Sequence, residues 1–502
     1  MARTRKKKAS IPGIIFFVLQ IVISVVFVVL LSGLNLLPTR YVIIIGAVLL
    51  ALAVLALIMQ ISRSGKAVGA IYSAVILVVL SIGSVYLWRT NTAIDQVVTD
   101  DRSVTSRITV LTKADSPMEG LQDLAGHVLG TQSSLDQAKM NQTLTELQIH
   151  FEDPLQTSDY ISYNAAVQGL YNGEVDAILF NEAFRGIITD TYPDFETETK
   201  TLSEYTYKEV VRTQETSKPE DSSNSGQTEE AKPKIEAPEE VFTVYISGND
   251  SFGAVTTESG RSDVNILMTI NTKTKQILLT TTPRDAYIQL PWGSYDKLTH
   301  AGIYGIDCSE ETLSAVYGIP IDYYVRINFE GFQNIVDALG GVEVYSDIAF
   351  TSWDGHWYDE GYNYLDGESA LSFVRERHSL AGGDFARGRN QMRMIQAVMD
   401  KATSPAILSN YLQLMDSLSY CFATDMPKDE ISKLVKMQLD DNAEWNIVSY
   451  EVNGWGNMRD TCYSAYGEAL SVVDLDPDSV NEAINKMHAL IDGEILYQET
   501  AE

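Results

Sequence analysis

The sequence contains few of the residues on which most metal and redox sites depend. Its 502 residues include three cysteines and six histidines, with no CxxC pair and no Cys/His spacing typical of zinc. Positive charge is also scarce, since 37 lysines and arginines stand against 67 aspartates and glutamates, for a formal net charge of -30. Such acidity repels a polyphosphate except where cations gather locally, which argues against nucleic acid as a partner.

Long apolar runs are confined to the first 90 residues. The runs Ile11–Leu31, Tyr41–Ile61 and Ala67–Leu87 are each about 20 residues long, enough for a helix to cross a hydrocarbon layer of roughly 30 Å. A cleaved signal peptide is the alternative for the first run, but no small-residue cleavage site follows it and two further runs do. Residues 1–90 are therefore predicted to be a multi-pass cell-membrane anchor of three transmembrane helices.

Basic residues set the expected orientation of this anchor. Arg3 to Lys8 precede the first run and Arg63 and Lys66 lie between the second and third, whereas the first outer loop offers only Arg40. Because lysine and arginine favour the cytoplasmic side, we expect a cytoplasmic N-terminus and a large extracytoplasmic domain.

The three cysteines fall in the part expected outside the cell, where a disulfide can persist. Cys421 and Cys462 are one candidate pair, with Cys308 as the remaining thiol. Connectivity does not follow from sequence alone, so the pairing stays open.

The chain after the anchor divides by composition. Residues 102–207 alternate short apolar runs with helical stretches, which predicts a small extracytoplasmic α/β accessory domain. Residues 208–240 are rich in Pro, Ser, Glu and Lys and nearly devoid of apolar side chains, which predicts a disordered acidic linker. Residues 241–487 form the expected main domain, of mixed α/β (α+β) class with a central mixed β-sheet flanked by helices, and residues 488–502 a C-terminal tail.

The main domain begins with three predicted strands that end in charged residues. "VFTVYISGND" ends at Asp250, "RSDVNILMTIN" opens with Arg261 and Asp263, and "KQILLTTTPRD" closes with Arg284 and Asp285. The turn "NTKTK" joins the second and third strands as a hairpin, so the last four residues share one sheet edge. Asp250 joins them if the first strand runs antiparallel to the second.

A second cluster of charge lies in "VRERHSLAGGDFARGRNQMR". Arg375 and Arg377 are two residues apart, which places them on the same side only of an extended chain, so we expect the preceding helix to end near Arg375. After the turn "AGG", Asp384 is the expected N-cap of the next helix, with a catalytic role as the alternative.

On that second helix, spacing separates inward from outward side chains. Arg387 and Gln391 are four residues apart and flank the apolar stripe, whereas Arg389 and Arg393 point away from it. The first two are the inward candidates, and the ordinary interpretation of Arg389 and Arg393 is solvated surface charge.

The chemistry that fits both clusters is phosphate binding. Guanidinium groups bind phosphate oxygens in pairs and stay charged at any relevant pH, and a pyrophosphate offers oxygens for several of them. Asp250 and Asp263 supply hard oxygens of the kind that magnesium prefers, although a single aspartate at a strand end is more often a turn residue. Together these residues indicate phosphoryl transfer.

The motifs also occur together in a known family. "GND", "RSDVNILMTIN", "TTTPRD", "KLTHAGIYG", "IDYYVRINFEGFQNIVDALGGVEV", "LDGESALSFVRERH" and "GDFARGRNQ" stand in the order seen in LytR-CpsA-Psr (LCP) proteins. The sequence from Val241 to Met487 resembles that family, and the three spans with an extra domain resemble its CpsA-like, capsule-associated branch of Gram-positive bacteria.

The resemblance implies an LCP ligase, a magnesium-dependent phosphotransferase. Such an enzyme moves an undecaprenyl-pyrophosphate-linked glycopolymer, such as capsular polysaccharide or wall teichoic acid, onto N-acetylmuramic acid of peptidoglycan. The implied partners are the polyprenyl-linked polymer, the peptidoglycan acceptor and the cytoplasmic membrane, with no nucleic acid. The implied cofactor is Mg²⁺, or Mn²⁺ in its place.

Matched position by position, the resemblance assigns roles to named residues. The metal ligands fall on Asp250 and Asp263. The catalytic set is Arg261, Arg284, Asp285, Arg375, Arg377, Asp384 and Arg387, in which either Asp285 or Asp384 is the candidate base. The substrate-binding set is Lys297, Arg389, Gln391, Phe329 and Phe332, the two phenylalanines being candidates for a lipid tunnel or, alternatively, plain helix core.

Two other functions stay open on the sequence. One is a membrane sensor that binds a lipid-linked glycan without chemistry, and the other is a polyprenyl pyrophosphatase that releases free polymer.

Overall fold

The structure is a computed structural model. It describes residues 11–61, 66–98, 103–132, 134–210, 240–249, 260–402, 422–441 and 443–498. The chain separates into two compact units, one formed mainly by residues 1–99 and 424–444 and the other mainly by residues 100–404 and 445–502.

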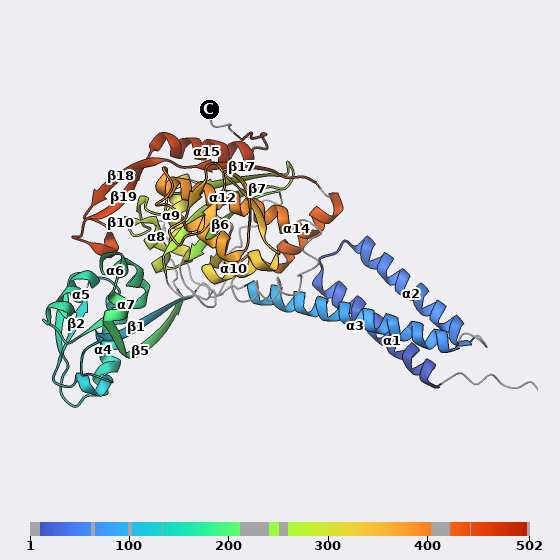
Figure 1. Cartoon of the computed structure of the whole chain (residues 1–502), viewed down its shortest axis with the longest axis horizontal. Coiled ribbons are helices and arrows are strands. Elements are labelled where there is room, and N and C mark those ends of the chain that lie inside the picture. The colour runs from blue at the N-terminus through green and yellow to red at the C-terminus, as the bar shows by residue number, and fades with distance from the viewer. Residues whose placement is uncertain are drawn as a thin grey trace, which may run out of the picture. The chain divides into compact units, whose positions relative to one another are not determined.

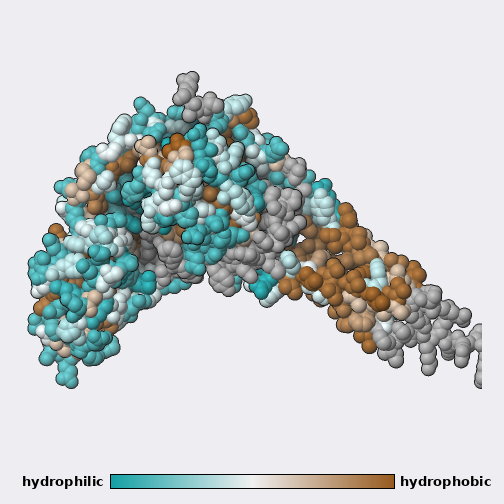
Figure 2. Space-filling view, viewed as in Figure 1, coloured by the Kyte–Doolittle hydropathy of each residue, from teal (hydrophilic) through white to brown (hydrophobic). Residues whose placement is uncertain are grey.

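The first unit contains three long apolar helices, α1 (Ile11–Leu34), α2 (Thr39–Ile61) and α3 (Lys66–Val97). All three are long and apolar enough to cross a membrane, as predicted. Their surface is the brown part of Figure 2. The third helix extends past Leu87, the expected end of the apolar run. The more polar residues after Leu87 continue the same helix to Val97. A later helix, α14 (Lys428–Asp441), joins this unit through an ion pair of 2.6 Å between Arg40 and Asp440.

The second unit begins with a five-stranded mixed sheet in the order β3-β2-β4-β1-β5. Its strands are β1 (Ser103–Lys113), β2 (Val128–Gln132), β3 (Gln156–Tyr160), β4 (Ala177–Asn181) and β5 (Thr199–Val210), and its helices are α4 (Gln137–Gln148), α5 (Tyr163–Asn172), α6 (Arg185–Thr191) and α7 (Phe195–Glu198). Strand β4, "AILFN", is buried throughout and packs in one apolar core with α4 and α5. We call residues 103–210 the accessory domain; they have the α/β character that the sequence predicts (Figure 1).

The main domain is built on a six-stranded sheet in the order β16-β11-β6-β7-β8-β17. These strands are β6 (Val241–Asn249), β7 (Ser262–Asn271), β8 (Gln276–Thr281), β11 (Tyr323–Asn328), β16 (Phe422–Thr424) and β17 (Asn446–Glu451). Strand β7 is antiparallel to both β6 and β8, whereas β11 runs parallel to β6 and β17 parallel to β8. The sheet is therefore mixed, as expected.

Helices and two-stranded sheets accompany this sheet. The helices are α8 (Leu298–Ala301), α9 (Ile306–Tyr317), α10 (Phe329–Ala338), α11 (Gly367–Arg375), α12 (Gly383–Ala402) and α15 (Pro477–Ile491). The two-stranded pairs are β9 (Tyr287–Gln289) with β10 (Tyr295–Lys297), β12 (Val342–Ser346) with β15 (Gly361–Leu365), β13 (Phe350–Thr351) with β14 (Trp357–Tyr358), and β18 (Gly454–Arg459) with β19 (Leu470–Leu475). Residues of α9 and α15 pack on β6, β7 and β8 in a single core that includes Tyr245, Leu267 and Met487.

The hairpin β7–β8 closes through its turn residues. The Asn271 side chain accepts hydrogen bonds from the backbone of Lys273 and Thr274, at 3.1 and 3.0 Å. Lys275 then adopts a left-handed conformation with φ 55°. An asparagine that bonds the backbone two residues onward is a standard way to start a turn, and it sets the register in which Ile266 faces Thr281.

Two cysteines are described, Cys308 and Cys462, and both are buried free thiols. Burial raises the pKa of each to about 12, so both are protonated thiols at neutral pH. Cys421, the other half of the candidate pair, lies outside the described residues.

The core of the main domain depends on Leu267, which is fully buried in the central strand. We expect Leu267→Ala to destabilise this domain by about 3 kcal/mol, through lost apolar burial and the cavity left behind. Calorimetry should show its unfolding midpoint lowered by about 6–12 °C. Lys273→Ala, in the turn of the same hairpin where the side chain is 69% exposed, is the control and should leave the midpoint nearly unchanged. Equal shifts in the two variants would contradict this packing.

Candidate functional site

One edge of the main sheet gathers the ends of five strands. Because β7 runs opposite to its neighbours, its first residues lie beside the last residues of β6, β8, β11 and β17. Asp263 near the start of β7, Arg284 after β8 and Asn328 at the end of β11 therefore approach one another. The hairpin prediction made from the sequence is confirmed here.

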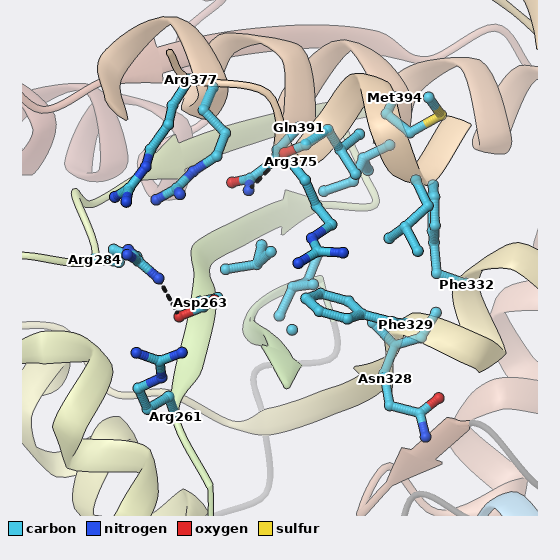
Figure 3. A pocket seen from close by; sticks show the side chains of 18 of the residues that line it. Arg261, Asp263, Arg284, Asn328, Phe329, Phe332, Arg375, Arg377, Gln391 and Met394 are labelled. Atoms are coloured by element: carbon cyan, nitrogen blue, oxygen red, sulfur yellow. Dashed lines mark hydrogen bonds and ion pairs between the residues drawn. The ribbon is translucent and has the colours of Figure 1, made fainter. Parts of the chain in front are cut away.

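A cavity of about 410 Å³ opens at this edge, and we call it the large cavity. Its charged lining consists of Asp190, Arg261, Asp263, Arg284, Arg375, Arg377 and Arg387. Five arginines against two aspartates leave an excess of three positive charges among the described lining residues. Figure 3 shows Arg261, Arg284, Arg375 and Arg377 extending toward the same space from different parts of the chain.

Asp263 and Arg284 form the buried centre of this arrangement. The Arg284 Nη1 donates to Asp263 Oδ1 at 2.8 Å, and the Thr299 hydroxyl donates to the same oxygen at 3.0 Å. Burial pushes the pKa of Asp263 upward, but Arg284, Arg261 and Arg387 outweigh it and hold that pKa at about 2. Burial likewise opposes the charge of Arg284, and Asp263 with Asp285 raises its pKa in spite of it. Both groups therefore stay charged at neutral pH.

Arg375 and Arg377 are held without carboxylates. Helix α11 ends at Arg375, as predicted, and the backbone is extended at Glu376. Arg375 therefore reaches the large cavity from the last residue of the helix, and Arg377 from just beyond it. The Arg375 guanidinium lies 4.5 Å from the ring centre of Phe329 and 5.8 Å from that of Trp353. Arg377 Nε donates to His378 Nε2 at 3.4 Å. Neither arginine makes an ion pair within the described part of the chain, so their charge is available to a ligand.

Helix α12 supplies the inward side chains expected of it. Arg387 and Gln391 are buried in the wall of the large cavity, and Gln391 Nε2 donates to the Val374 carbonyl at 3.3 Å. The prediction that Asp384 caps this helix is wrong, because the helix already begins at Gly383. Asp384 lies in the first turn instead, where its carboxylate pairs with Arg387 one turn later.

The opposite wall of the large cavity is apolar. Phe329 and Phe332 from α10 line it together with Leu371, Val374, Met394 and Ile395. Figure 3 shows Phe332 and Met394 on the side away from Arg261 and Arg284. The other apolar residues of α10, Ile335 and Val336, are buried outside the lining and belong to the helix core. Phe329 and Phe332 thus line the cavity, and their contact with a lipid stays a prediction.

The predicted site residues Lys297, Asp285 and Arg389 do not line the large cavity. Lys297 pairs with Asp285 at 3.0 Å, while Lys297 and Arg284 lower the pKa of Asp285 against the opposing effect of burial. Arg389 turns away, as its helical position predicts, and pairs with Glu451 at 2.6 Å. Asp250 lies outside the described residues.

Sequence reasoning missed Glu451, the last residue of β17. Together with Asp263, Arg284, Asp384 and Arg387 it lines a second, much smaller cavity. Burial raises its pKa to about 7 despite the opposing effect of Arg389, and its Oε1 has no hydrogen-bond partner in the described structure. Its position at the end of a strand parallel to β8 would have placed it at the site. That position can be recognised only when the order of the strands in the sheet is known.

Trp353 and Asp190 were missed for a different reason. Trp353 lies just after the two-residue strand β13, and Asp190 belongs to helix α6 of the accessory domain. Neither adjoins a motif in the sequence, so only the folded chain brings them to the large cavity.

The described residues do not by themselves make a magnesium site. No group of three or more His, Cys, Asp or Glu side chains among them could hold a metal ion. Asp263 is the described member of the predicted pair, and its Oδ1 already accepts two hydrogen bonds.

Comparison with known proteins agrees with the motifs at this site. The sequence model of the LytR_cpsA_psr family matches residues 201–478, more than half of the chain. The chain belongs to this family. Among relatives, it is 35% identical over 224 residues to the polyisoprenyl-teichoic acid–peptidoglycan teichoic acid transferase TagU of Enterococcus faecalis, covering 44% of this chain and 73% of that one.

Other LytR_cpsA_psr proteins match over similar stretches. The TagU of Bacillus mycoides is 35% identical over 199 residues, which cover 39% of this chain and 64% of the relative, slightly less than two thirds of its length. Solved structures that match include "TagT bound to LI-WTA", with 27% identity, a TM-score of 0.40 and coverage of 50% of this chain and 90% of that one. TagU of B. subtilis matches with 24% identity, a TM-score of 0.39 and coverage of 51% and 100%.

Glu451 should make stability depend on pH. Its folded pKa of about 7 lies above the usual 4.5, so the folded state keeps a proton that the unfolded state has lost between these values. Its contribution to stability therefore falls as pH rises from 4.5 to 7, by up to about 3 kcal/mol. Calorimetry at pH 5 and pH 8 should show the wild type losing more stability than Glu451→Gln. An unchanged difference between the two proteins would contradict the raised pKa.

Proposed function

We propose that the protein is a glycopolymer–peptidoglycan phosphotransferase. It takes a polyprenyl-pyrophosphate-linked polymer, such as capsular polysaccharide or wall teichoic acid, and joins it to N-acetylmuramic acid. The substrate headgroup lies against the arginines of the large cavity, and the first part of its lipid tail lies against the apolar wall.

The observation that carries this proposal is the two-sided lining of the large cavity. A polyprenyl pyrophosphate combines a compact polyanion with a long hydrocarbon chain, and such a ligand needs cations and apolar side chains in one space. Arg375 and Arg377 offer charge that no described carboxylate neutralises, and Phe329 and Phe332 offer apolar surface beside it. An apolar cavity with a few convergent polar groups is typical of small-molecule sites.

The transfer proposed is a substitution at phosphorus. The acceptor hydroxyl oxygen bonds to the phosphorus that carries the polymer, and the bond from that phosphorus to the bridging oxygen breaks. The bridging oxygen leaves as part of polyprenyl phosphate, and the hydroxyl proton passes to a base or to water. Negative charge grows on the leaving phosphate, where guanidinium groups already in position stabilise it.

The paired arginines have a supporting role in this scheme. Arg284 is held by Asp263 and Arg387 by Asp384, so both guanidinium groups are aimed before a substrate arrives. Arg375 is held by two aromatic rings, which restrain it while leaving its N–H donors available. Side chains fixed in advance lose less entropy when they bind the headgroup.

The names of the relatives support the same reaction class. The matched relatives are called polyisoprenyl-teichoic acid–peptidoglycan transferases. The three apolar helices fit a multi-pass membrane anchor. We place the N-terminus in the cytoplasm and both the accessory and main domains outside, where peptidoglycan is found.

The reaction can be tested with the full chain in detergent, a lipid-linked polymer and a peptidoglycan acceptor. We expect Arg375→Ala to lower the rate of polymer transfer about 100-fold or more, because it removes an unpaired positive charge from the headgroup. Release of polyprenyl phosphate and attachment of polymer should be measured together.

Arg393→Ala is the matched control. Arg393 lies on the next helix but pairs with the exposed Asp347 and is absent from the cavity lining, so its loss should leave the rate nearly unchanged. Polymer release without attachment would show a pyrophosphatase, and tight binding without turnover would show a sensor. Either result overturns the proposal.

A magnesium ion, or manganese in its place, held by Asp250 and Asp263 is part of the proposal. Its support is that Asp263 stays ionised at the cavity wall. We expect EDTA to abolish transfer and added Mg²⁺ to restore it, while EDTA already saturated with Mg²⁺ has no effect. A rate that survives exhaustive chelation would remove the metal from the scheme.

A further inference from the structure

The accessory domain packs directly on the main domain. Ile303 of the main domain belongs to the buried apolar core of the accessory domain, and the rings of Phe184 and Tyr304 lie 6.4 Å apart across the boundary. Ser162 donates a hydrogen bond to Glu468 at 3.0 Å. These contacts place helix α6 of the accessory domain at the wall of the large cavity.

Helix α6 covers one of the cavity arginines. Arg261 Nη1 donates to Asp190 Oδ2 at 2.9 Å and to the Gly186 carbonyl at 3.3 Å. Gly186 approaches so closely that a Cβ there would lie 2.8 Å from the Arg261 Cζ. Because Gly186 has no side chain, helix α6 can pack directly against the Arg261 guanidinium. The Asp190 carboxylate then forms an ion pair with it.

The contact sets two anions in competition for one cation. Asp190 is part of the lining of the large cavity, although it belongs to another domain. It pairs with Arg261, which lines the same cavity. A bound headgroup and the Asp190 carboxylate repel each other, and both need the Arg261 guanidinium.

We propose that Asp190 is an intramolecular latch that competes with the anionic headgroup for Arg261, so that substrate binding and release of helix α6 are coupled. The inference rests on the proposed function, because it assumes a pyrophosphate in the large cavity. Coupling of this kind is reciprocal: a headgroup that displaces Asp190 loosens α6, and anything that draws α6 away strengthens headgroup binding. The accessory domain thereby controls how readily the cavity accepts its substrate.

The test uses the full chain in detergent, with inorganic pyrophosphate as the probe and calorimetric titration as the measurement. We expect Asp190→Asn to bind pyrophosphate about fivefold more tightly than the wild type, because the competing charge is gone. The charge-matched control is Glu196→Gln, an exposed residue of α7 outside the cavity lining, which should bind as the wild type does. In the wild type, pyrophosphate should also speed amide hydrogen exchange in residues 185–191.

The outcomes separate the latch from the proposed function. Unchanged or weaker binding by Asp190→Asn overturns the latch and makes Asp190 a residue that positions Arg261. An equal gain in pyrophosphate affinity in Glu196→Gln also overturns the latch, since the gain would then come from the lower net negative charge of the protein. If Arg375→Ala still abolishes pyrophosphate binding in either case, the proposed function stands alone. Absence of binding in the wild type and in Asp190→Asn overturns both.

Discussion

The ion pair between Arg284 and Asp263 is the contact on which the cavity depends. Its two side chains are 12% and 17% exposed, so each charge would be costly to bury without the other. The pair joins the end of β8 to the start of β7, and Thr299 from α8 completes the shell of the carboxylate. The remaining cavity arginines are arranged around this pair, whose net charge is zero. Because the Asp263 carboxylate offsets the charge of Arg284, the guanidinium groups of the site repel one another less.

The cations of the site divide into two kinds. Arg261, Arg284 and Arg387 each have a carboxylate partner, whereas Arg375 and Arg377 have none in the described part of the chain. A carboxylate partner fixes the position of an arginine but reduces the positive potential that the arginine contributes to the cavity. The unpaired arginines supply most of that potential. An acidic protein can therefore carry many arginines in a short stretch. Several of them are neutralised by carboxylates, and the unpaired ones direct their charge into the large cavity.

Much of the main domain follows from local pattern. The hairpin of β7 and β8 was predictable because the turn residues and apolar runs are contiguous, and the end of α11 was predictable from the two-residue spacing of Arg375 and Arg377. Helix α12 begins two residues earlier than an N-cap at Asp384 implies, since an aspartate in the first turn and an N-cap aspartate have similar sequence signatures.

By itself, the sequence determined the apolar helices of the anchor, the strands and turn that align Asp263 with Arg284, and the family to which the chain belongs. These features depend on neighbouring residues and on periodicity. Only the tertiary structure decided that Glu451, Trp353 and Asp190 reach the same site, because each arrives through packing between segments far apart in the chain. The contact between the accessory domain and Arg261 is of this second kind, since it depends on how the two domains pack against each other.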